Sequence, residues 1–204
     1  MQKQKTSSEK TSGIILAAGY STRMGRPKLL LPFGKRTVIE NLVHEAVNSC
    51  LNEVLVITGE FHTIIAEKVK PFGVTLIRNP HPAKGMLSSV RCGLESLDDR
   101  VKAIAVIPAD QPRISREVIN QLHHEFHHTS FRITLPVFNG KRGHPLFFSS
   151  EFKQRILTQY DETGLRGLLM DFPNEVLEHP VDDRGVLEDM NTPEDYQKLL
   201  KSIS

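Results

Sequence analysis

Three charged residues of this sequence, Arg23, Lys28 and Asp110, are of the types needed to bind a nucleoside triphosphate and its metal ion. Arg offers a planar fork of donors to phosphate oxygens, and Lys offers a compact positive charge. An Asp that directly follows a buried strand offers hard oxygen ligands to Mg²⁺. Together these side chains suit the binding of a nucleoside triphosphate, whose negative charge needs cationic donors and a metal ion.

The loop that carries both cations follows a short apolar strand predicted over residues 13–16. The small residues after this strand let the backbone come close to a ligand. A surface loop with cations present by chance is the alternative, but most strand-to-helix loops are far shorter than this one. The residues of this stretch that are predicted to bind the nucleotide are Leu16, Ala17, Ala18, Gly19, Ser21, Arg23, Gly25 and Lys28, and Arg23 and Lys28 are also predicted to be catalytic.

The loop differs from two well-known phosphate-binding patterns. A Walker A loop needs Lys and then Ser or Thr directly after its second Gly, whereas Arg26 and Pro27 follow Gly25 here. The Gly-x-Gly-x-x-Gly fingerprint is also missing, which removes the main support for a dehydrogenase-type dinucleotide fold.

Residues 16–28 instead resemble the signature of the nucleotidyltransferases that activate phosphorylated compounds with a nucleoside triphosphate. The resemblance is greatest to the molybdenum-cofactor branch, the MobA-like NTP transferases, whose pattern is Leu-Ala-Ala/Gly-Gly-x-Ser-x-Arg-Met-Gly-x-x-Lys. Three further patches extend the resemblance from about residue 13 to residue 196. It implies the fold of the nucleotide-diphospho-sugar transferases, an α/β three-layer sandwich around a mostly parallel, Rossmann-like sheet.

The alternation of apolar and amphipathic stretches also predicts an α/β fold with a mostly parallel sheet and helices on both faces. Strands are expected at 13–16, 53–58, 74–77, 101–107, 132–137 and 175–179, and helices at 37–49, 63–70, 86–97, 115–128, 152–157 and 163–170. Residues 138–148 are expected to form a glycine-rich excursion between strands.

Length and composition indicate one domain over residues 13–204, with residues 1–12 as a disordered lead-in. The net charge of +2 gives no basic field for nucleic acid. Residues 1–12 lack the apolar core of a secretory signal, and no apolar run approaches the roughly 20 residues of a membrane helix. Two cysteines are too few for a disulfide framework, so a cytoplasmic location without membrane attachment is expected.

A second patch lies where a proline-rich loop turns into the helix expected after Gly85. Free backbone N–H groups and hydroxyls in the first turn of a helix favour an acceptor-rich ligand. Ordinary capping of the helix by Ser is the alternative. The resemblance implies contacts with the base and ribose, and the residues concerned are Asn79, Gly85, Ser88 and Ser89.

Asp110 ends the clearest buried strand, and ligands of open parallel sheets bind beyond the carboxyl ends of strands. An aspartate that only caps a turn is the alternative. The resemblance implies that Asp110 binds Mg²⁺ and is catalytic together with Arg23 and Lys28, although Ala109 replaces the Gly of the family pattern. Asn191 stands where the family has a second metal-binding Asp, and Asp189 is the other candidate for the second ligand.

The third patch concerns the acceptor. A basic, glycine-rich loop suits a phosphorylated acceptor, and the resemblance implies that it lines the acceptor side of the site. The residues predicted to bind the substrate are Gln111, Gly143, His144 and Pro145. A tight hairpin turn with an exposed His is the alternative.

The resemblance implies transfer of CMP from CTP to the terminal phosphate of molybdenum-loaded molybdopterin, with release of pyrophosphate, for maturation of a molybdenum hydroxylase such as a xanthine dehydrogenase. The guanylyl branch usually has Leu-Ala-Gly-Gly, so Ala18 favours CTP. One methyl group discriminates by only about 1–3 kcal/mol, and GTP and ATP stay open. A phosphate monoester is mostly ionised at neutral pH and needs no general base.

Three other functions are compatible with parts of the sequence. A sugar- or alcohol-phosphate nucleotidyltransferase would share the fold, and a non-catalytic molybdopterin carrier would share the binding residues. His124 and His128 also complete a His-Glu-x-x-His pattern, which is a zinc protease signature. That pattern falls within a run of histidines on a predicted outer helix, where two residues four apart share a face and could bind metal only incidentally.

Overall fold

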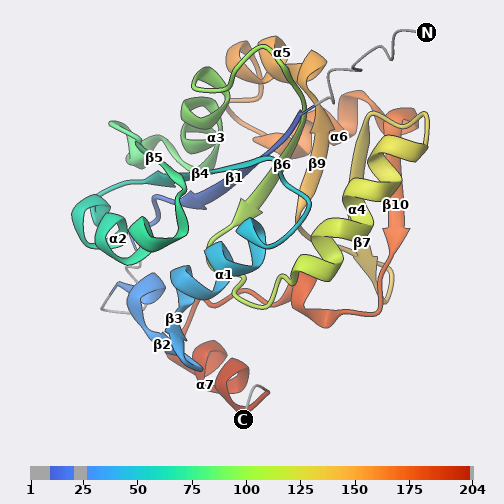
Figure 1. Cartoon of the computed structure of the whole chain (residues 1–204). Helices are drawn as coiled ribbons and strands as arrows, with labels where there is room; N and C mark the ends of the chain where they lie inside the picture. The colour runs from blue at the N-terminus through green and yellow to red at the C-terminus, as the bar shows by residue number, and fades with distance from the viewer. Residues whose placement is uncertain (1–9, 21–26, 203–204) are drawn as a thin grey trace, which may run out of the picture.

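A mostly parallel sheet runs through the middle of the protein, and the computed structural model describes the chain over residues 10–20 and 27–202 (Figure 1). β1 lies between β4 and β6 and is parallel to both, and β9 is antiparallel to both of its neighbours. The spatial order of the main sheet is β10 (Val176–Pro180), β7 (Ile133–Phe138), β9 (Leu146–Ser149), β6 (Val101–Pro108), β1 (Lys10–Ala17), β4 (Glu53–Thr58) and β5 (Thr75–Arg78), with β8 (Lys141–Arg142) paired to β7.

Each face of this sheet has its own apolar core, because successive strand residues point to opposite sides. Ile15 packs with the helices α1, α2, α4 and α7 on one face, while its neighbour Ile14 packs with α3, α5 and α6 on the other. The helices are α1 (Val38–Val47), α2 (His62–Val69), α3 (Met86–Glu95), α4 (Arg116–His128), α5 (Lys153–Thr158), α6 (Leu165–Asp171) and α7 (Pro193–Lys201). The expected α/β three-layer sandwich is therefore confirmed. Among the described residues, no helix is both long and apolar enough to cross a bilayer.

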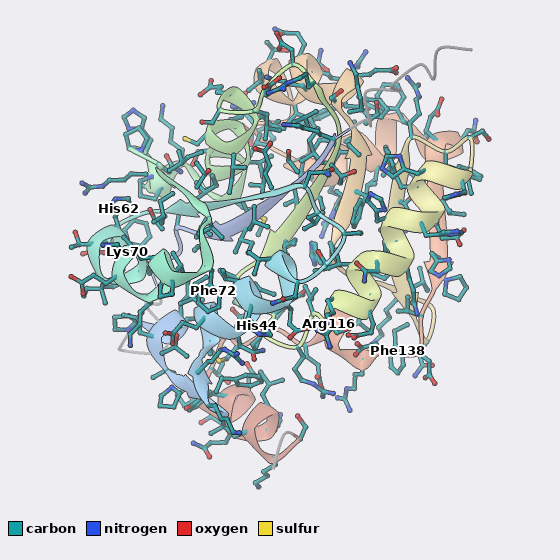
Figure 2. All side chains as sticks on the ribbon, viewed as in Figure 1. His44, His62, Lys70, Phe72, Arg116 and Phe138 are labelled. Carbon is teal, nitrogen blue, oxygen red and sulfur yellow. The ribbon has the colours of Figure 1, made fainter. Side chains whose placement is uncertain are left out.

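Local sequence signals determine where several helices begin. Thr37 caps α1, and its hydroxyl accepts a hydrogen bond from Glu40 N while the Glu40 carboxylate accepts one from Thr37 N. The same capping box joins Thr192 and Asp195 at the start of α7. Figure 2 shows how α1 meets the end of the α2 region, where the His44 and Phe72 rings lie edge to face with centroids 6.3 Å apart.

β1 begins at Lys10, so the strand predicted over residues 13–16 starts three residues earlier than expected. Thr11 and Ser12 are fully buried in the sheet. Thr11 exchanges hydrogen bonds with Asn52 through its backbone, and its hydroxyl lies 2.9 Å from His127 Nε2. These polar residues are satisfied by partners far along the chain, which the polar character of 1–12 does not reveal.

β9 is a second difference between the predicted and the observed fold, because the sequence predicts residues 138–148 as a glycine-rich loop between strands. Leu146, Phe147 and Phe148 are instead buried in the sheet between β6 and β7. Phe147 packs into one core and Phe148 into the other. The excursion is therefore limited to the residues between β7 and β9, and it ends in a central antiparallel strand.

The carboxyl ends of β1, β4 and β6 lie at one edge of the sheet. The strand register pairs Leu16 with Pro108 and Ala17 with Thr58. Backbone hydrogen bonds continue past the strands, from Ala109 N to the Leu16 carbonyl and from Asn79 N to the Thr58 carbonyl. The loops after these strands therefore converge, which is where ligands bind in open α/β sheets.

Candidate active site

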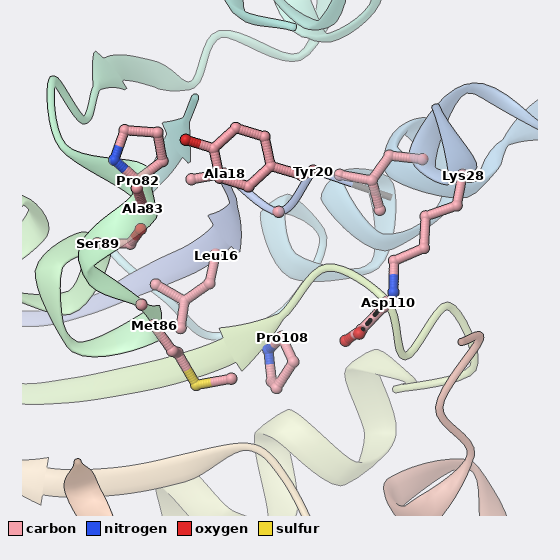
Figure 3. A pocket seen from close by; sticks show the side chains of 13 residues that line it. Leu16, Ala18, Tyr20, Lys28, Pro82, Ala83, Met86, Ser89, Pro108 and Asp110 are labelled. Carbon is pink, nitrogen blue, oxygen red and sulfur yellow. Dashed lines mark hydrogen bonds and ion pairs between the residues drawn. The ribbon is translucent and has the colours of Figure 1, made fainter. Parts of the chain in front are cut away.

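A pocket of about 370 Å³ opens at this edge of the sheet (Figure 3). The loop after β1, the segment that leads into α3, and the end of β6 form its walls. The lining residues are Leu16, Ala18, Gly19, Tyr20, Lys28, Leu29, Pro82, Ala83, Gly85, Met86, Ser89, Pro108 and Asp110. Seven of these, namely Leu16, Ala18, Gly19, Lys28, Gly85, Ser89 and Asp110, are among the predicted site residues.

Lys28, Asp110 and Asn191 meet at one point, although they are far apart in the chain. Lys28 Nζ lies 2.9 Å from Asp110 Oδ2 and donates a hydrogen bond to Asn191 Oδ1 at 3.1 Å. Lys28 precedes α1, Asp110 follows β6, and Asn191 precedes α7. Three separate connections thus bring together a cation, a carboxylate and an amide oxygen. Lys28 and Asp110 line the pocket, where Figure 3 shows their ion pair, and Asn191 contacts Lys28.

The segment before α7 is fixed to the end of β6 by two further contacts. Met190 N donates to the Asp110 carbonyl at 2.8 Å, and Gln111 Nε2 donates to Asp189 Oδ1 at 2.7 Å. The Gln111 side chain is almost fully buried, and its Oε1 has no hydrogen-bond partner among the described residues. The Gln111 amide N–H group therefore binds Asp189, and the Gln111 Oε1 atom can still accept a hydrogen bond from a bound ligand.

Two oxygen atoms of this group suit a divalent cation. Asp110 Oδ2 and Asn191 Oδ1 both approach the Lys28 ammonium, so they can reach one cation together. Mg²⁺ is usually held by one or two protein oxygens, with phosphate oxygens and waters as its other ligands. No cluster of three or more His, Cys, Asp or Glu suited to a metal occurs within residues 10–20 and 27–202. The donor set at Asp110 thus fits a cation shared with a phosphate ligand, not one enclosed by protein alone.

The predicted base and ribose segment is internally hydrogen-bonded. The buried Asn79 amide donates to Ser88 Oγ at 2.8 Å and to Ser89 Oγ at 3.0 Å, and its Oδ1 accepts from His81 N. Gly85 has a φ of 85°, which glycine adopts without strain, and it starts α3. Ser89 and Gly85 line the pocket, whereas Asn79 and Ser88 are not among its lining residues and hold the loop in shape through these hydrogen bonds.

Ala17 and Ala18 differ in position although they are neighbours. Ala17 belongs to the apolar core, while Ala18 lines the pocket. Gly59 lies against Ala18, since a Cβ at Gly59 would approach the Ala18 carbonyl to 2.7 Å. The predictions for Ser21, Arg23 and Gly25 lie outside the described residues.

Tyr20 and Met86 are lining residues that sequence reasoning missed. Their side chains are unusually open for large apolar groups, at 42% and 59% exposed. Tyr20 occupies the unspecified position of the Gly-x-Ser pattern, and Met86 directly follows Gly85. A large apolar residue next to a glycine of the binding loop is the signal that could have found both.

Gly143, His144 and Pro145 are held against the segment that leads to Asn191. His144 N donates to the Val186 carbonyl at 3.0 Å, and a Cβ on Gly143 would lie 2.4 Å from that same oxygen. Burial lowers the pKa of the His144 imidazole, and the nearby carboxylates of Asp189 and Asp110 oppose this shift. His144 Nδ1 is buried and has no hydrogen-bond partner among the described residues. The loop thus brings a buried imidazole close to the carboxylates of Asp189 and Asp110.

The histidines of α4 lie away from this pocket. The His124 and His128 rings stack with centroids 4.0 Å apart, and the His123 and His127 rings lie tilted to each other with centroids 4.4 Å apart. Two of these histidines have structural hydrogen-bond partners. His127 Nε2 lies 2.9 Å from the Thr11 hydroxyl, and His128 Nδ1 lies 2.7 Å from the His124 carbonyl oxygen. This arrangement offers no support for a zinc protease.

We expect acid to destabilise the protein through His123. Burial lowers the pKa of His123 from 6.5 to about 4, helped by repulsion from His127, His128 and His124. The unfolded chain then binds more protons than the folded chain between these values, so the free energy of unfolding falls as pH drops from about 6.5 to about 4. Urea unfolding of His123→Gln should show a shallower pH dependence than wild type in this window. The exposed His81→Gln serves as control, and equal slopes for all three proteins would contradict the expectation.

Comparison with known proteins identifies relatives along most of the chain. Residues 13–178 match the family model described as the MobA-like NTP transferase domain. The chain is 26% identical over 190 residues to the molybdenum cofactor cytidylyltransferase of Escherichia coli (strain K12), covering 90% of this chain and 92% of that protein. It is 30% identical over 206 residues to the probable molybdenum cofactor guanylyltransferase of Bacillus cereus (strain G9842), covering 95% and 97%. It is also 29% identical over 203 residues to the purine catabolism protein PucB of Bacillus subtilis (strain 168), covering 94% and 97%.

Solved structures agree on the fold. Rv0371c from Mycobacterium tuberculosis H37Rv superposes with a TM-score of 0.85 at 24% identity, covering 94% of this chain and 97% of that one. A complex of Rv0371c with manganese superposes with a TM-score of 0.81 at 23% identity, covering 95% and 99%. The 4-diphosphocytidyl-2C-methyl-D-erythritol synthase of Anaerococcus prevotii DSM 20548 gives 0.76 at 14% identity, covering 96% of each chain. The expected nucleotide-diphospho-sugar transferase fold is therefore confirmed.

Proposed function

Because this chain belongs to the MobA-like NTP transferase domain family, it is a nucleotidyltransferase, and we propose that it moves CMP from CTP onto the terminal phosphate of molybdenum-loaded molybdopterin. The observation that carries this proposal is the convergence of Lys28, Asp110 and Asn191 beside the pocket that Lys28 and Asp110 line. The names of the Escherichia coli and Bacillus cereus relatives support the molybdenum cofactor as the acceptor.

In the proposed reaction the acceptor phosphate attacks the α-phosphate of CTP, and pyrophosphate leaves. The attacking phosphate is already ionised, so the protein needs only to align two anions and neutralise their charge. We assign Lys28 to the triphosphate because its ammonium lines the pocket. We assign Arg23 to the same task on the strength of the sequence motif.

We propose that Asp110 and Asn191 hold Mg²⁺ with the triphosphate. The ion, when bound, would supply positive charge to the phosphate oxygens. The manganese named for the Rv0371c complex supports a divalent cation at this fold. We propose a supporting position beside the ion for Asp189, whose Oδ1 accepts a hydrogen bond from Gln111.

We place the acceptor on the side of the site that Gln111, His144 and Asp189 form. Two buried polar atoms there, Gln111 Oε1 and His144 Nδ1, have no partner among the described residues. A pterin with its ring N–H groups and amide-like oxygen would offer such partners. We propose that the product serves a molybdenum hydroxylase, and the name of PucB, a purine catabolism protein, supports a role in purine breakdown.

CTP is proposed as the donor because Ala18 lines the pocket with its methyl group. The relatives include both cytidylyl and guanylyl enzymes at similar identity, so the pocket residue carries this choice. The experiment is pyrophosphate release with Mg²⁺ and molybdenum-loaded molybdopterin, with CTP, GTP and ATP compared in parallel. Release with CTP supports both reaction and donor, whereas release with GTP alone keeps the reaction and overturns the donor. No release with any of the three contradicts the proposed reaction.

Ala18→Gly should lower the preference for CTP over GTP in that assay by about tenfold or more. Removing one methyl from a pocket changes discrimination by roughly 1–3 kcal/mol. Ala17→Gly is the matched control, because its methyl lies in the core and not in the pocket. An unchanged CTP to GTP ratio in Ala18→Gly would remove Ala18 from nucleotide choice.

A further inference from the structure

The Lys28 ammonium lies between the two oxygen atoms that suit a metal ion. It is 2.9 Å from Asp110 Oδ2 and 3.1 Å from Asn191 Oδ1. The Lys28 side chain is 12% exposed and that of Asp110 is 29% exposed, so water screens this ion pair less than it screens a surface pair. In this structure the Lys28 ammonium thus occupies the position beside both oxygen atoms that a metal ion would use.

A divalent cation and this ammonium exclude one another at that point. Mg²⁺ approaches its oxygen ligands to about 2.0–2.1 Å, closer than an ammonium does. An ion bound to both Asp110 and Asn191 would therefore fall in the space next to Lys28 Nζ. Two like charges at such a distance repel strongly in a partly buried site. The ion can bind both oxygens only if Lys28 moves away.

We infer that Lys28 and the divalent cation exchange places at Asp110, so that the protein takes up the cation together with the nucleoside triphosphate and binds it poorly alone. This inference rests on the proposed function, since it takes Asp110 as the metal-binding carboxylate. Among the three converging groups, Asp110 brings one negative charge, Lys28 brings one positive charge and Asn191 is neutral. These three groups together carry no net negative charge, and the Asp189 carboxylate beside them already accepts a hydrogen bond from Gln111.

The triphosphate resolves this competition. Its oxygens give Lys28 a new anionic partner, and they add negative charge and further ligands for the cation. Lys28 lines the nucleotide pocket as well as contacting Asp110, so its ammonium has the phosphates within the same site as its new partner. Cation and nucleotide thus bind with positive coupling, each raising the affinity for the other.

The test measures Mn²⁺ binding to the full-length protein without nucleotide, by the electron paramagnetic resonance signal of free Mn²⁺. Lys28→Met removes the competing charge and should bind Mn²⁺ on the order of 10- to 100-fold more tightly than wild type. Lys28→Arg keeps the charge and should show no gain. Lys102→Met removes an equal charge at the start of β6, at the opposite end of the strand from Asp110, and should match wild type.

The gain in Lys28→Met should disappear when Asp110→Asn is added, which locates the bound ion. Lys28→Gln is a second neutral variant, and circular dichroism establishes that each protein is folded. The exchange is wrong if folded Lys28→Met and Lys28→Gln bind Mn²⁺ no more tightly than wild type. The readout needs neither acceptor nor donor. A gain in Mn²⁺ binding without pyrophosphate release would therefore refute the proposed reaction alone, and release without the gain would refute the exchange alone.

Discussion

Asp110→Ala is expected to lower the rate of pyrophosphate release roughly a thousandfold or more while the protein stays folded. Charge stabilisation by a bound cation contributes several kcal/mol to a transition state, and each 1.4 kcal/mol or so is worth tenfold in rate. The structure indicates that the fold will tolerate the change. The Asp110 side chain is partly exposed at the end of β6, and the Met190 contact uses the Asp110 backbone carbonyl, which alanine keeps.

The rate is measured at saturating CTP and several Mg²⁺ concentrations. Asp99→Ala, which removes an exposed carboxylate before β6, should leave the rate unchanged. Thermal unfolding of both variants within a few degrees of wild type would establish that the loss is chemical. A rate for Asp110→Ala within tenfold of wild type would remove Asp110 from the metal site.

Gly143→Ala is expected to destabilise the protein by about 2 kcal/mol and to impair binding of the acceptor. The added Cβ would lie 2.4 Å from the Val186 carbonyl and 2.9 Å from the Val186 side chain. The loop and the segment before Asn191 must then separate, at a cost typical of overpacking, about 1–3 kcal/mol. The hydrogen bond from His144 N to Val186 would be lost with that movement.

Differential scanning fluorimetry should show a Tm lower by about 4–8 °C, as expected for a chain of this size. The KM for molybdopterin should rise more than the KM for CTP, because the altered loop lies on the proposed acceptor side. Gly19→Ala is the stability control, since a Cβ there meets no atom within 4 Å among the described residues. A Tm of Gly143→Ala equal to that of Gly19→Ala would contradict the close contact.

The sequence predicts most of the architecture because strongly apolar strands such as β4 and β6 are readable from local pattern alone. It does not reveal β9, whose aromatic residues follow a glycine-rich stretch and are buried only by strands from elsewhere in the chain. The start of β1 is missed for a related reason, since Thr11 and Ser12 are polar and are satisfied by the distant residues Asn52 and Glu53.

The candidate site was predictable to the extent that motifs mark it. Lys28, Asp110 and Asn191 are each identified by a local pattern, and the structure brings them together. Motifs do not separate residues that face the ligand from those that support them. Ser88 and Ser89 are adjacent in the sequence, but only Ser89 lines the pocket. Tyr20 and Met86 stand at unspecified positions of the motifs, next to Gly19 and Gly85, and the folded structure shows that they form part of the wall.

The contact between Lys28 and Asn191 spans 163 positions of the chain, and this has a consequence for biosynthesis. Translation at about 5–20 residues per second takes roughly 8–33 s to cover that distance. During this time β1, β4 and β6 can already pair, but Asp110 and Lys28 have not yet met Asn191. The segment that precedes α7 is among the last to be synthesised, and its arrival completes the site. A nascent chain stalled before residue 191 would carry an ordered sheet and an incomplete centre.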